Sequence, residues 1–310
     1  MKKRKVTILG SGHVGSHVAL TLAYDGIADE IVLVDKIEKL AKGQALDIYD
    51  TMSVTSHEVL VRAGDYSDVQ DSDVVVCAIG RSRVPSENRV DMLADSIVMC
   101  DELLDSLKPY KIPGIFISIT NPCDVIADYM RKGLGLDWRR AFGTGTLLDT
   151  VRLKKVIGHA AGVARSSVQC VVMGEHGESS MIPFSLARVG TVPYKSLHIS
   201  EEDVLQEVRR GGWVIVEGKA CTEFGIGRAA SAMVACVLRD EQKVLPASVV
   251  LHGEYGEKDV QIGVPCVIGA DGIKEVLEVP MTSEELAKFH HSCDVVRGNI
   301  AAAAKLGKQN

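Results

Sequence analysis

Two short segments hold residue types that could transfer a proton beside a bound anion. Asp149-Thr150-Val151-Arg152 lies in a helical pattern, and its i, i+3 spacing places a carboxylate and a guanidinium on one helix face. Gly174-Glu175-His176-Gly177 follows an apolar run, and glycine on both sides gives the histidine room beside a ligand. The structural alternatives are a weak surface ion pair and a histidine that serves only the fold.

A third segment could close over such a ligand. Gly80-Arg81-Ser82-Arg83-Val84-Pro85-Ser86-Glu87-Asn88-Arg89 combines three arginines, a proline and small residues directly after the apolar run 74–79. This composition packs poorly against a core, but it brings positive charge to an anion. The alternative interpretation is a surface loop with solvated charge.

The elements that must position these residues begin near the N-terminus. The apolar run 6–9, the turn Gly10-Ser11-Gly12-His13-Val14-Gly15, a helical pattern and the apolar run 31–34 follow the order of a dinucleotide-binding βαβ unit. Gly10 allows the tight turn, Gly12 lets the backbone approach a pyrophosphate, and Gly15 lets the helix pack close to the strand. A tight turn without a ligand is the structural alternative.

Asp35 indicates which dinucleotide would bind. It lies twenty residues after Gly15, where a carboxylate can accept hydrogen bonds from both ribose hydroxyls. Its charge would repel a 2′-phosphate, while the N–H groups at the start of the first helix would hold the pyrophosphate. NAD is therefore favoured over NADP.

The N-terminal half alternates apolar runs with helical patterns, which predicts a doubly wound parallel sheet of the Rossmann type. Further strands are expected at 59–61, 74–79 and 115–119, helices at 38–47 and 90–107, and a closing strand at 140–143. Such sheets bind ligands at the carboxyl ends of their strands, so the loops after residues 9, 34, 79 and 119 are the ones of interest.

The pattern changes at Thr144, which predicts a second domain of the α+β class. Helices are expected at 149–158, 204–220 and 226–239, a strand at 168–173, antiparallel strands at 247–252, 260–263 and 265–268, and a last helix capped by Ser283. We therefore expect a dinucleotide-binding domain, 1–143, and a substrate domain, 144–310, with a cleft between them.

Composition excludes several classes of function. The 310 residues are 46% hydrophobic and 25% charged, which suits two folded domains. The net charge of −6 gives no general attraction to nucleic acid or to an anionic membrane, and no apolar run is long enough to span a bilayer. Eight scattered cysteines without a C-x-x-C pair indicate thiols of a reducing, cytoplasmic compartment and no metal site. His290-His291-x-Cys293 is interpreted as a solvated helix face.

Taken together, these segments resemble the L-lactate/L-malate dehydrogenase family. The resemblance rests on segments that occur in the order and at the spacings of that family. They are the glycine turn with Asp35, the loop ending in Arg89, Ile119-Thr120-Asn121-Pro122, Gly143-Thr144-Gly145-Thr146-Leu147-Leu148-Asp149-Thr150-Val151-Arg152, and Gly174-Glu175-His176-Gly177. The resemblance runs from about Val6 to the last helix.

The resemblance implies a catalytic group and a substrate clamp. His176 would be the general acid that protonates the 2-oxo oxygen, and Asp149 would hold its imidazole and raise its pKa. Arg152 would clamp the substrate carboxylate with two parallel hydrogen bonds. Arg89 would arrive with the closing loop and polarise the reacting carbonyl.

The resemblance also implies the binding residues. Asn121 and Thr222 would line the substrate pocket, and the Asn121–Pro122 peptide bond is expected to be cis. The implied contacts with NAD come from Gly10, Gly12, His13, Val14, Gly15, Asp35, Gly80, Asn121 and Ile226.

The residues that the resemblance links to substrate choice point to two different substrates. Arg83 aligns with the loop position that faces the C3 group of the substrate, where arginine favours the second carboxylate of oxaloacetate. Gly143-Thr144-Gly145-Thr146 and Thr222 are of the lactate type. The neighbours of Arg83 depart from both patterns and leave its direction open. We expect reduction of pyruvate to L-lactate, with oxaloacetate or a broader range of 2-oxo acids as the alternative.

Assembly and regulation follow from the resemblance alone. Relatives are homotetramers or homodimers, and many bacterial ones bind fructose 1,6-bisphosphate through an arginine and a histidine. Lys154 and Gln169 hold those positions here, so we expect weak or absent activation by that sugar. Two other classes stay open: a non-catalytic NAD-binding scaffold, and an NAD-dependent glycosidase with a metal site, for which Cys123 is a candidate ligand.

Overall fold

The computed structural model describes residues 3–80 and 89–308, and it describes side chains from residue 92 onward in the second range. Arg83 and the side chain of Arg89 therefore lie outside the described residues. Among the helices of these two ranges, none combines the length and apolar character needed to cross a membrane.

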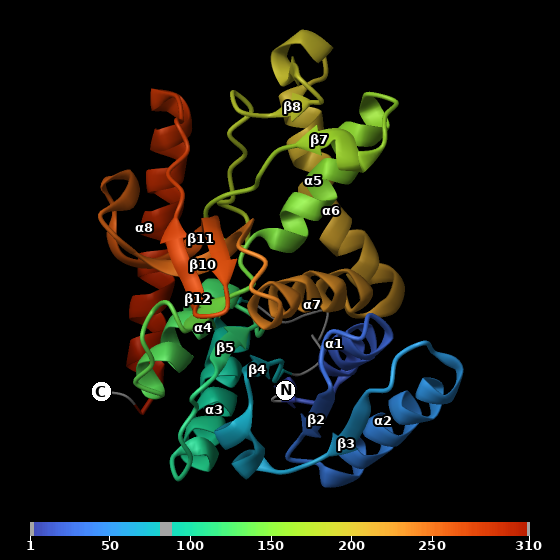
Figure 1. Ribbon diagram of the computed structural model, residues 1–310. Coiled ribbons are helices and arrows are strands. Elements are labelled where there is room, and N and C mark those ends of the chain that lie inside the picture. The colour runs from blue at the N-terminus through green and yellow to red at the C-terminus, as the bar shows by residue number, and fades with distance from the viewer. Residues whose placement is uncertain (1–2, 81–88, 309–310) are drawn as a thin grey trace.

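A nine-stranded sheet runs through both halves of the chain, in the order β12-β11-β10-β6-β5-β4-β1-β2-β3 (Figure 1). Its parallel part consists of β1 (Lys5–Leu9), β2 (Glu30–Val34), β3 (Leu60–Ala63), β4 (Val74–Cys77), β5 (Ile115–Ser118) and β6 (Ala141–Gly143). Its antiparallel part consists of β10 (Lys243–His252), β11 (Lys258–Gly269) and β12 (Gly272–Val276). β1, β4 and β5 are buried along their whole length, as expected for strands covered on both faces.

Helices cover both faces of the sheet. The first face packs against α1 (His13–Tyr24), α2 (Glu38–Thr51) and α7 (Phe224–Leu238) through a core that includes Leu22, Ile31 and Val234. The second face packs against α3 (Arg89–Leu107) and α4 (Cys123–Gly133) through a core that includes Ile97 and Ile126. The long α8 (Ser283–Leu306) packs beside α4 and β11. The predicted Rossmann sheet with an α+β second part is thus confirmed.

A smaller lobe stands above the sheet in Figure 1. It contains α5 (Leu147–Ala160), α6 (Glu201–Lys219) and a three-stranded sheet of β7 (Val168–Gln169), β8 (Arg188–Val189) and β9 (Val192–Pro193). Leu153, Ile157 and Val204 belong to its own buried cluster. Five short 3₁₀ helices complete the described elements: η1 (Met52–Val54), η2 (Tyr66–Asp71), η3 (Arg165–Ser167), η4 (Tyr194–Leu197) and η5 (Glu254–Gly256).

Several expectations for the sheet were wrong. β6 does not close it, because Gly143 pairs with Ser248 and so joins the antiparallel strands to the parallel ones. Segments 260–263 and 265–268 form one strand, β11, in which Pro265 lies opposite Pro246 rather than interrupting the ladder. β12 was not expected at all. Short-range sequence patterns cannot show which strand a segment will pair with. Pairing decides where β6 ends, whether β11 is continuous and whether β12 forms.

Two other boundaries were also wrong. The expected strand 168–173 ends at Gln169, because side chains of the α5 region take the backbone groups of Val172: Thr150 Oγ1 accepts its N–H at 2.9 Å, and Thr146 Oγ1 donates to its carbonyl at 2.6 Å. The cap of α8 is Thr282 and not Ser283. Thr282 and Glu285 form a reciprocal capping box, and Glu285 also binds the Ser185 N–H at 2.9 Å.

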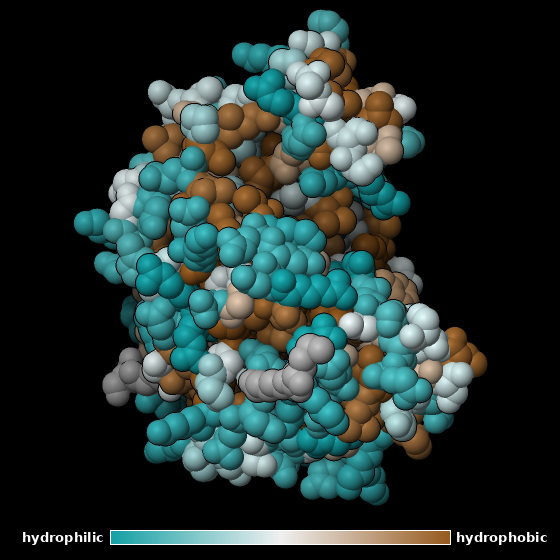
Figure 2. All heavy atoms as spheres, viewed as in Figure 1, coloured by the Kyte–Doolittle hydropathy of each residue, from teal (hydrophilic) through white to brown (hydrophobic). Residues whose placement is uncertain are grey.

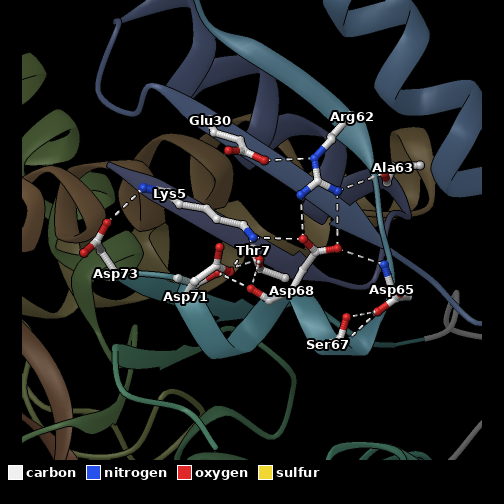
Figure 3. Close-up of polar contacts among 11 residues, drawn as sticks. Lys5, Thr7, Glu30, Arg62, Ala63, Asp65, Ser67, Asp68, Asp71 and Asp73 are labelled. Carbon is white, nitrogen blue, oxygen red and sulfur yellow. Dashed lines mark hydrogen bonds and ion pairs between the residues drawn. The ribbon is translucent and has the colours of Figure 1, made fainter. Parts of the chain in front are cut away.

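An ionic network lies at the amino ends of the parallel strands (Figure 3). Asp68 accepts hydrogen bonds from the ammonium group of Lys5 at 2.8 Å and from Arg62 at 2.5 Å, and Arg62 also binds Glu30 at 2.8 Å. Lys5 is buried, and its ammonium group also binds Asp71. Burial alone would raise the pKa of Asp68, but the two cations hold it near 2.

The eight cysteines are free thiols, and six of them are buried. Cys293 is one of the six, so the interpretation of the segment 290–293 as a solvated face was wrong for this residue. The helical period places Cys293 beside Phe289 and Val296 on the core side of α8. His291 is exposed, and His290 Nδ1 lies 3.2 Å from Glu257.

Candidate active site

The glycine turn has the geometry that close approach of a phosphate requires. Gly10 has φ of +98°, and a Cβ there would lie 2.6 Å from the Ala78 carbonyl oxygen. A Cβ at Gly15 would lie 1.9 Å from the Gly10 carbonyl oxygen, so helix and turn are too close for any side chain. A Cβ at Gly12 would meet nothing within 4 Å, which leaves open space in front of the helix. The first hydrogen bond of α1 runs from Ser16 N–H to the Gly12 carbonyl, so the N–H groups before Ser16 can face a phosphate.

Asp35 fixes the turn and lines a cavity beside it. Its carboxylate accepts the Ser11 N–H at 2.8 Å and the Ile37 N–H at 2.9 Å. The cavity of about 270 Å³ lies at the carboxyl ends of β1, β2 and β4, with Gly10, Gly12 and Gly80 in its wall. The cavity is lined mainly by apolar residues and glycine backbone, and its charged groups are Asp35 and the ion pair of Lys36 and Glu102. Such a lining fits the adenosine part of NAD.

His176, Asp149 and Arg152 come together at the foot of the smaller lobe. His176 Nδ1 lies 2.6 Å from Asp149 Oδ2, and Arg152 Nη1 donates to Asp149 Oδ1 at 3.0 Å. The side chain of His176 is 24% exposed, and those of Asp149 and Arg152 are each 15% exposed. Asp149 lies in the first turn of α5 and Arg152 one turn later, as their spacing predicted. This is not the surface ion pair of the structural alternative.

The pair of His176 and Asp149 keeps the imidazole charged. The negative charge of Asp149 outweighs the effect of burial and raises the pKa of His176 to about 9. Burial would raise the pKa of Asp149, but His176 and Arg152 together lower it. Because a carboxylate can only accept, Nδ1 of His176 is the donor to Asp149 and Nε2 is left to carry the second proton. Near pH 7 the site therefore holds an imidazolium that can donate a proton.

The histidine turn, residues 174–179, is fixed by the surrounding fold. Gly174 has φ of +91°, exchanges backbone hydrogen bonds with Gly263, and leaves no room for a Cβ beside Ser292. Ser292 Oγ accepts the Glu175 N–H at 2.8 Å. A Cβ at Gly177 would lie 2.6 Å from the Glu175 carboxyl carbon. The glycines thus serve the packing of the turn, and the reason expected for them, room for a ligand beside His176, was incomplete.

Sequence reasoning missed three residues that support this site. Asp124 is buried, with 3% of its surface exposed, and its carboxylate accepts the backbone N–H of His176 at 2.8 Å. Ser292 anchors the turn from α8. Gly212 of α6 faces Arg152, because a Cβ there would lie 3.6 Å from the guanidinium. A carboxylate within the apolar helical segment after Pro122 was the one available signal, and it could have singled out Asp124.

The remaining candidates have no hydrogen bond to this centre among the described residues. The Asn121–Pro122 bond is cis, as expected, and the Asn121 carbonyl accepts Ser96 Oγ at 3.0 Å. Thr222 is half-buried between α6 and α7. Val14 and Ile226 pack on the core shared by α1 and α7. His13 is exposed, and its Nδ1 lies 3.1 Å from Glu223.

Lys154 and Gln169 lie on the wall of a separate cavity of about 600 Å³. Its other walls come mainly from apolar residues of α5, α7 and β10, and Figure 2 shows hydrophobic atoms around a hollow in this part of the molecule. Cys123, the candidate metal ligand, is buried instead: its Sγ accepts the Gly145 N–H at 3.3 Å, and burial raises its pKa to about 12. A thiol held protonated in this way is a poor metal ligand.

A Rossmann sheet with a cavity that fits adenosine and a partly buried imidazolium beside an arginine defines an NAD-dependent oxidoreductase that moves a proton together with a hydride. Comparison with known proteins agrees. Residues 4–143 match the lactate/malate dehydrogenase NAD-binding domain, and residues 146–306 match the α/β C-terminal domain of the same family. The chain belongs to the lactate/malate dehydrogenase family and is an NAD-dependent 2-hydroxyacid oxidoreductase, which removes the scaffold alternative.

Individual relatives cover nearly the whole chain. An L-lactate dehydrogenase of Fusobacterium nucleatum is 37% identical over 309 residues, 97% of each chain. A lactate dehydrogenase of Cryptosporidium parvum, solved with lactic acid and NAD, has a TM-score of 0.93 at 29% identity and covers 98% of each chain. The malate dehydrogenase of the same organism also has a TM-score of 0.93, at 27% identity, covering 98% of this chain and all of that one. The backbone fold is therefore common to both substrate types.

Proposed function

We propose that this chain interconverts pyruvate and L-lactate with NAD as the redox partner. The observation that carries the proposal is Asp149 lying between His176, at 2.6 Å, and Arg152, at 3.0 Å. One group can donate a proton, the other can bind a carboxylate, and a 2-oxo acid needs both next to each other. NADH, when bound, supplies the hydride for the carbonyl carbon.

In this proposal His176 is the proton donor. Its Nε2 protonates the 2-oxo oxygen during reduction and takes the proton back during oxidation. Asp149 stabilises the imidazolium and fixes which ring nitrogen faces the substrate. Arg152 holds the substrate carboxylate with two parallel hydrogen bonds, which orients the carbonyl toward His176. Among the described residues, Arg152 donates a hydrogen bond only to Asp149, so its other donors can serve the substrate.

The other candidate residues complete the site in this proposal. Arg89 polarises the carbonyl, and Asn121 and Thr222 line the pocket. NAD binds along Gly10, Gly12, His13, Val14, Gly15, Asp35, Gly80, Asn121 and Ile226. We place the boundary between the NAD-binding and substrate domains at residues 143 and 144, although the sheet continues from Gly143 to Ser248.

Pyruvate is preferred over oxaloacetate for two reasons. The segment Gly143–Thr146 and Thr222 resemble the lactate type, and the Fusobacterium nucleatum relative reported above carries the lactate name. Arg83 is the observation that favours oxaloacetate, since its charge would pair with a second carboxylate. With pyruvate, a buried Arg83 would lack a partner, which is costly unless it turns to solvent.

A substrate panel tests this choice. With saturating NADH, kcat/KM is measured for pyruvate, oxaloacetate and 2-oxoisocaproate in wild type and in Arg83→Gln. Pyruvate is expected to be the best substrate, and Arg83→Gln is expected to lower activity with oxaloacetate specifically. If oxaloacetate exceeds pyruvate a hundredfold, the chain is a malate dehydrogenase.

We also propose a homotetramer or homodimer in the cytoplasm. Exposed apolar side chains on α2 and η1, at Leu46, Tyr49 and Val54, support a subunit interface, as do Val151 and Val244 at the larger cavity. Light scattering coupled to size-exclusion chromatography should give two or four times the 33.4 kDa chain mass. A mass of one chain at micromolar concentration would exclude the proposed assembly.

A further inference from the structure

Asp124 connects the parallel sheet to the histidine turn. It is the second residue of α4, which begins directly after Asn121 and Pro122. One carboxylate oxygen, Oδ2, accepts the backbone N–H of His176 at 2.8 Å, and the other, Oδ1, accepts Ser248 Oγ at 2.6 Å. The carboxylate therefore bridges the catalytic histidine of the proposed mechanism and the strand where the two parts of the sheet join.

This bridge is buried and anchored at its far end. Ser248 is fully buried, and its carbonyl accepts Gln261 Nε2 at 2.6 Å. Gln261 is 1% exposed on β11. A carboxylate with two such hydrogen bonds inside the core has little freedom to move, because each displacement would leave a buried donor unpaired.

The charges around the bridge also connect it to His176. The groups that face Asp124 are His176 and Glu175 of the histidine turn, the neighbouring Cys123 of α4, and Cys293 of α8. His176 is faced in addition by Asp149 and Arg152 of α5. Burial raises the pKa of Asp124 to about 6, so at pH 7 and above the carboxylate is mainly ionised and adds to the field that favours a protonated imidazole.

We propose that Asp124 is a positioning residue: it sets the backbone of His176 so that the imidazole meets Asp149, and its negative charge supports the imidazolium. This inference rests on the proposed function, in which His176 is the proton donor. Asp149 binds the imidazole ring of His176, and Asp124 binds the backbone N–H of the same residue. Together they fix the orientation of the ring and the position of the backbone that carries it.

Two substitutions separate position from charge. Asp124→Ala removes both hydrogen bonds, and kcat should fall on the order of 10²-fold, the usual effect of a displacement of about 1 Å. Asp124→Asn can retain an oxygen that accepts the His176 N–H, while it removes the charge and presents an amide N–H donor to Ser248 Oγ in place of an acceptor. It should keep kcat within about tenfold, but it should move the alkaline limb of the pH profile for reduction to lower pH. Ser248→Ala, which removes one anchor, should lie between wild type and Asp124→Ala.

Asp128→Asn is the matched control. Asp128 lies one turn further along α4 and is 4% exposed, but its partners are Arg131 and Lys132. This substitution should affect thermal stability and leave kcat and the pH profile unchanged. If the Asp124 variants lose only thermal stability, as Asp128→Asn does, the positioning role is wrong. Should Asp124→Ala not fold, the pair of asparagine variants decides.

An NMR titration of the imidazole makes the test independent of turnover. The resonance of His176 is assigned by its loss in His176→Asn, and its pKa is compared between wild type and Asp124→Asn. A lower pKa in the variant supports the positioning role even if no 2-oxo acid is turned over, in which case only the proposed function fails. An unchanged pKa together with an unchanged pH profile contradicts the inference itself.

Discussion

Asp68 and Asp149 each lie between two cationic groups, but we propose a role in catalysis for Asp149 alone. Asp68 is held by Lys5 and Arg62 at the amino ends of the parallel strands. Asp149 is held by His176 and Arg152 at the start of α5. Both carboxylates are largely buried, at 13% and 15% side-chain exposure, and both have a lowered pKa. The carboxylates themselves therefore do not distinguish the two places.

The difference lies in the cations. The pKa values of Lys5 and Arg62 lie far above neutrality and are raised further by their acidic partners, so neither group exchanges a proton near pH 7. Arg62 also spreads its donors over Asp68, Glu30 and a backbone carbonyl. His176 can lose its proton near pH 9, and Arg152 gives Asp149 only one of its donors. A buried ionic cluster serves the fold when every proton and donor is committed, and it can serve catalysis when one proton and several donors are not.

The largest effect is expected at the histidine. His176→Asn removes the proton donor, and kcat for pyruvate reduction should fall about 10³-fold, within the usual range for a general acid. Steady-state NADH oxidation measures this, with NADH fluorescence as the control for cofactor binding. Asp68→Asn should leave kcat unchanged. Equal loss of kcat in both variants would contradict the distinction between the clusters.

The second effect concerns the two arginines. Arg152→Lys replaces a two-pronged clamp by a point charge, so KM for pyruvate should rise about 10²-fold. Arg62→Lys, the matched control, should leave KM at the wild-type value. An unchanged KM for pyruvate in Arg152→Lys would contradict the difference between the two arginines.

The third effect is the pH dependence of the reaction. Because the folded pKa of His176 is about 9, kcat/KM for pyruvate reduction should be level up to that pH and fall about tenfold per unit above it. The oxidation of lactate should rise over the same range. The pairing also stabilises the fold below pH 6.5, and this contribution is lost as pH rises through about 9. A break near pH 6.5 in both directions would mean that Asp149 does not charge the imidazole.

The fourth effect is on stability at low pH. The pKa of Asp68 is lowered to about 2, so its contribution to folding, on the order of 2 kcal/mol, is present above pH 4 and lost as pH falls toward 2. Asp68→Asn should lower the free energy of unfolding by a similar amount at pH 7 and flatten its acid dependence. Urea unfolding at pH 7 and pH 3 measures both. Equal acid sensitivity in wild type and variant would argue against the network.

The smallest effect is expected at the larger cavity, whose wall holds Lys154, the neutral Gln169 and a second cation, Arg228. Arg228 is already paired with Asp25, so a bisphosphate gains little there, and millimolar fructose 1,6-bisphosphate should change KM for pyruvate less than about twofold. Initial rates with and without the sugar test this. A large drop in KM would contradict this expectation.

The sequence itself determined the parts that depend on local spacing. The glycine turn with Asp35 indicated an NAD-binding βαβ unit, and the i, i+3 spacing placed Asp149 and Arg152 on one helix face. These predictions succeeded because a turn needs particular backbone angles and a helix repeats every 3.6 residues. The family resemblance then supplied the pairing of Asp149 with His176, which no local pattern contains.

Only the tertiary structure decided how distant segments support that pair. The junction of β6 with β10 and the carboxylate of Asp124 under His176 join residues more than fifty positions apart. The continuous β11 likewise depends on its pairing with β10 and β12. Such contacts are set by which surfaces pack, and a carboxylate in an apolar helical segment shows in sequence that Asp124 is unusual but not which donors it meets. The tertiary fold also brought His176 to Asp149, and the charge of that carboxylate outweighs the effect of burial and keeps the histidine protonated.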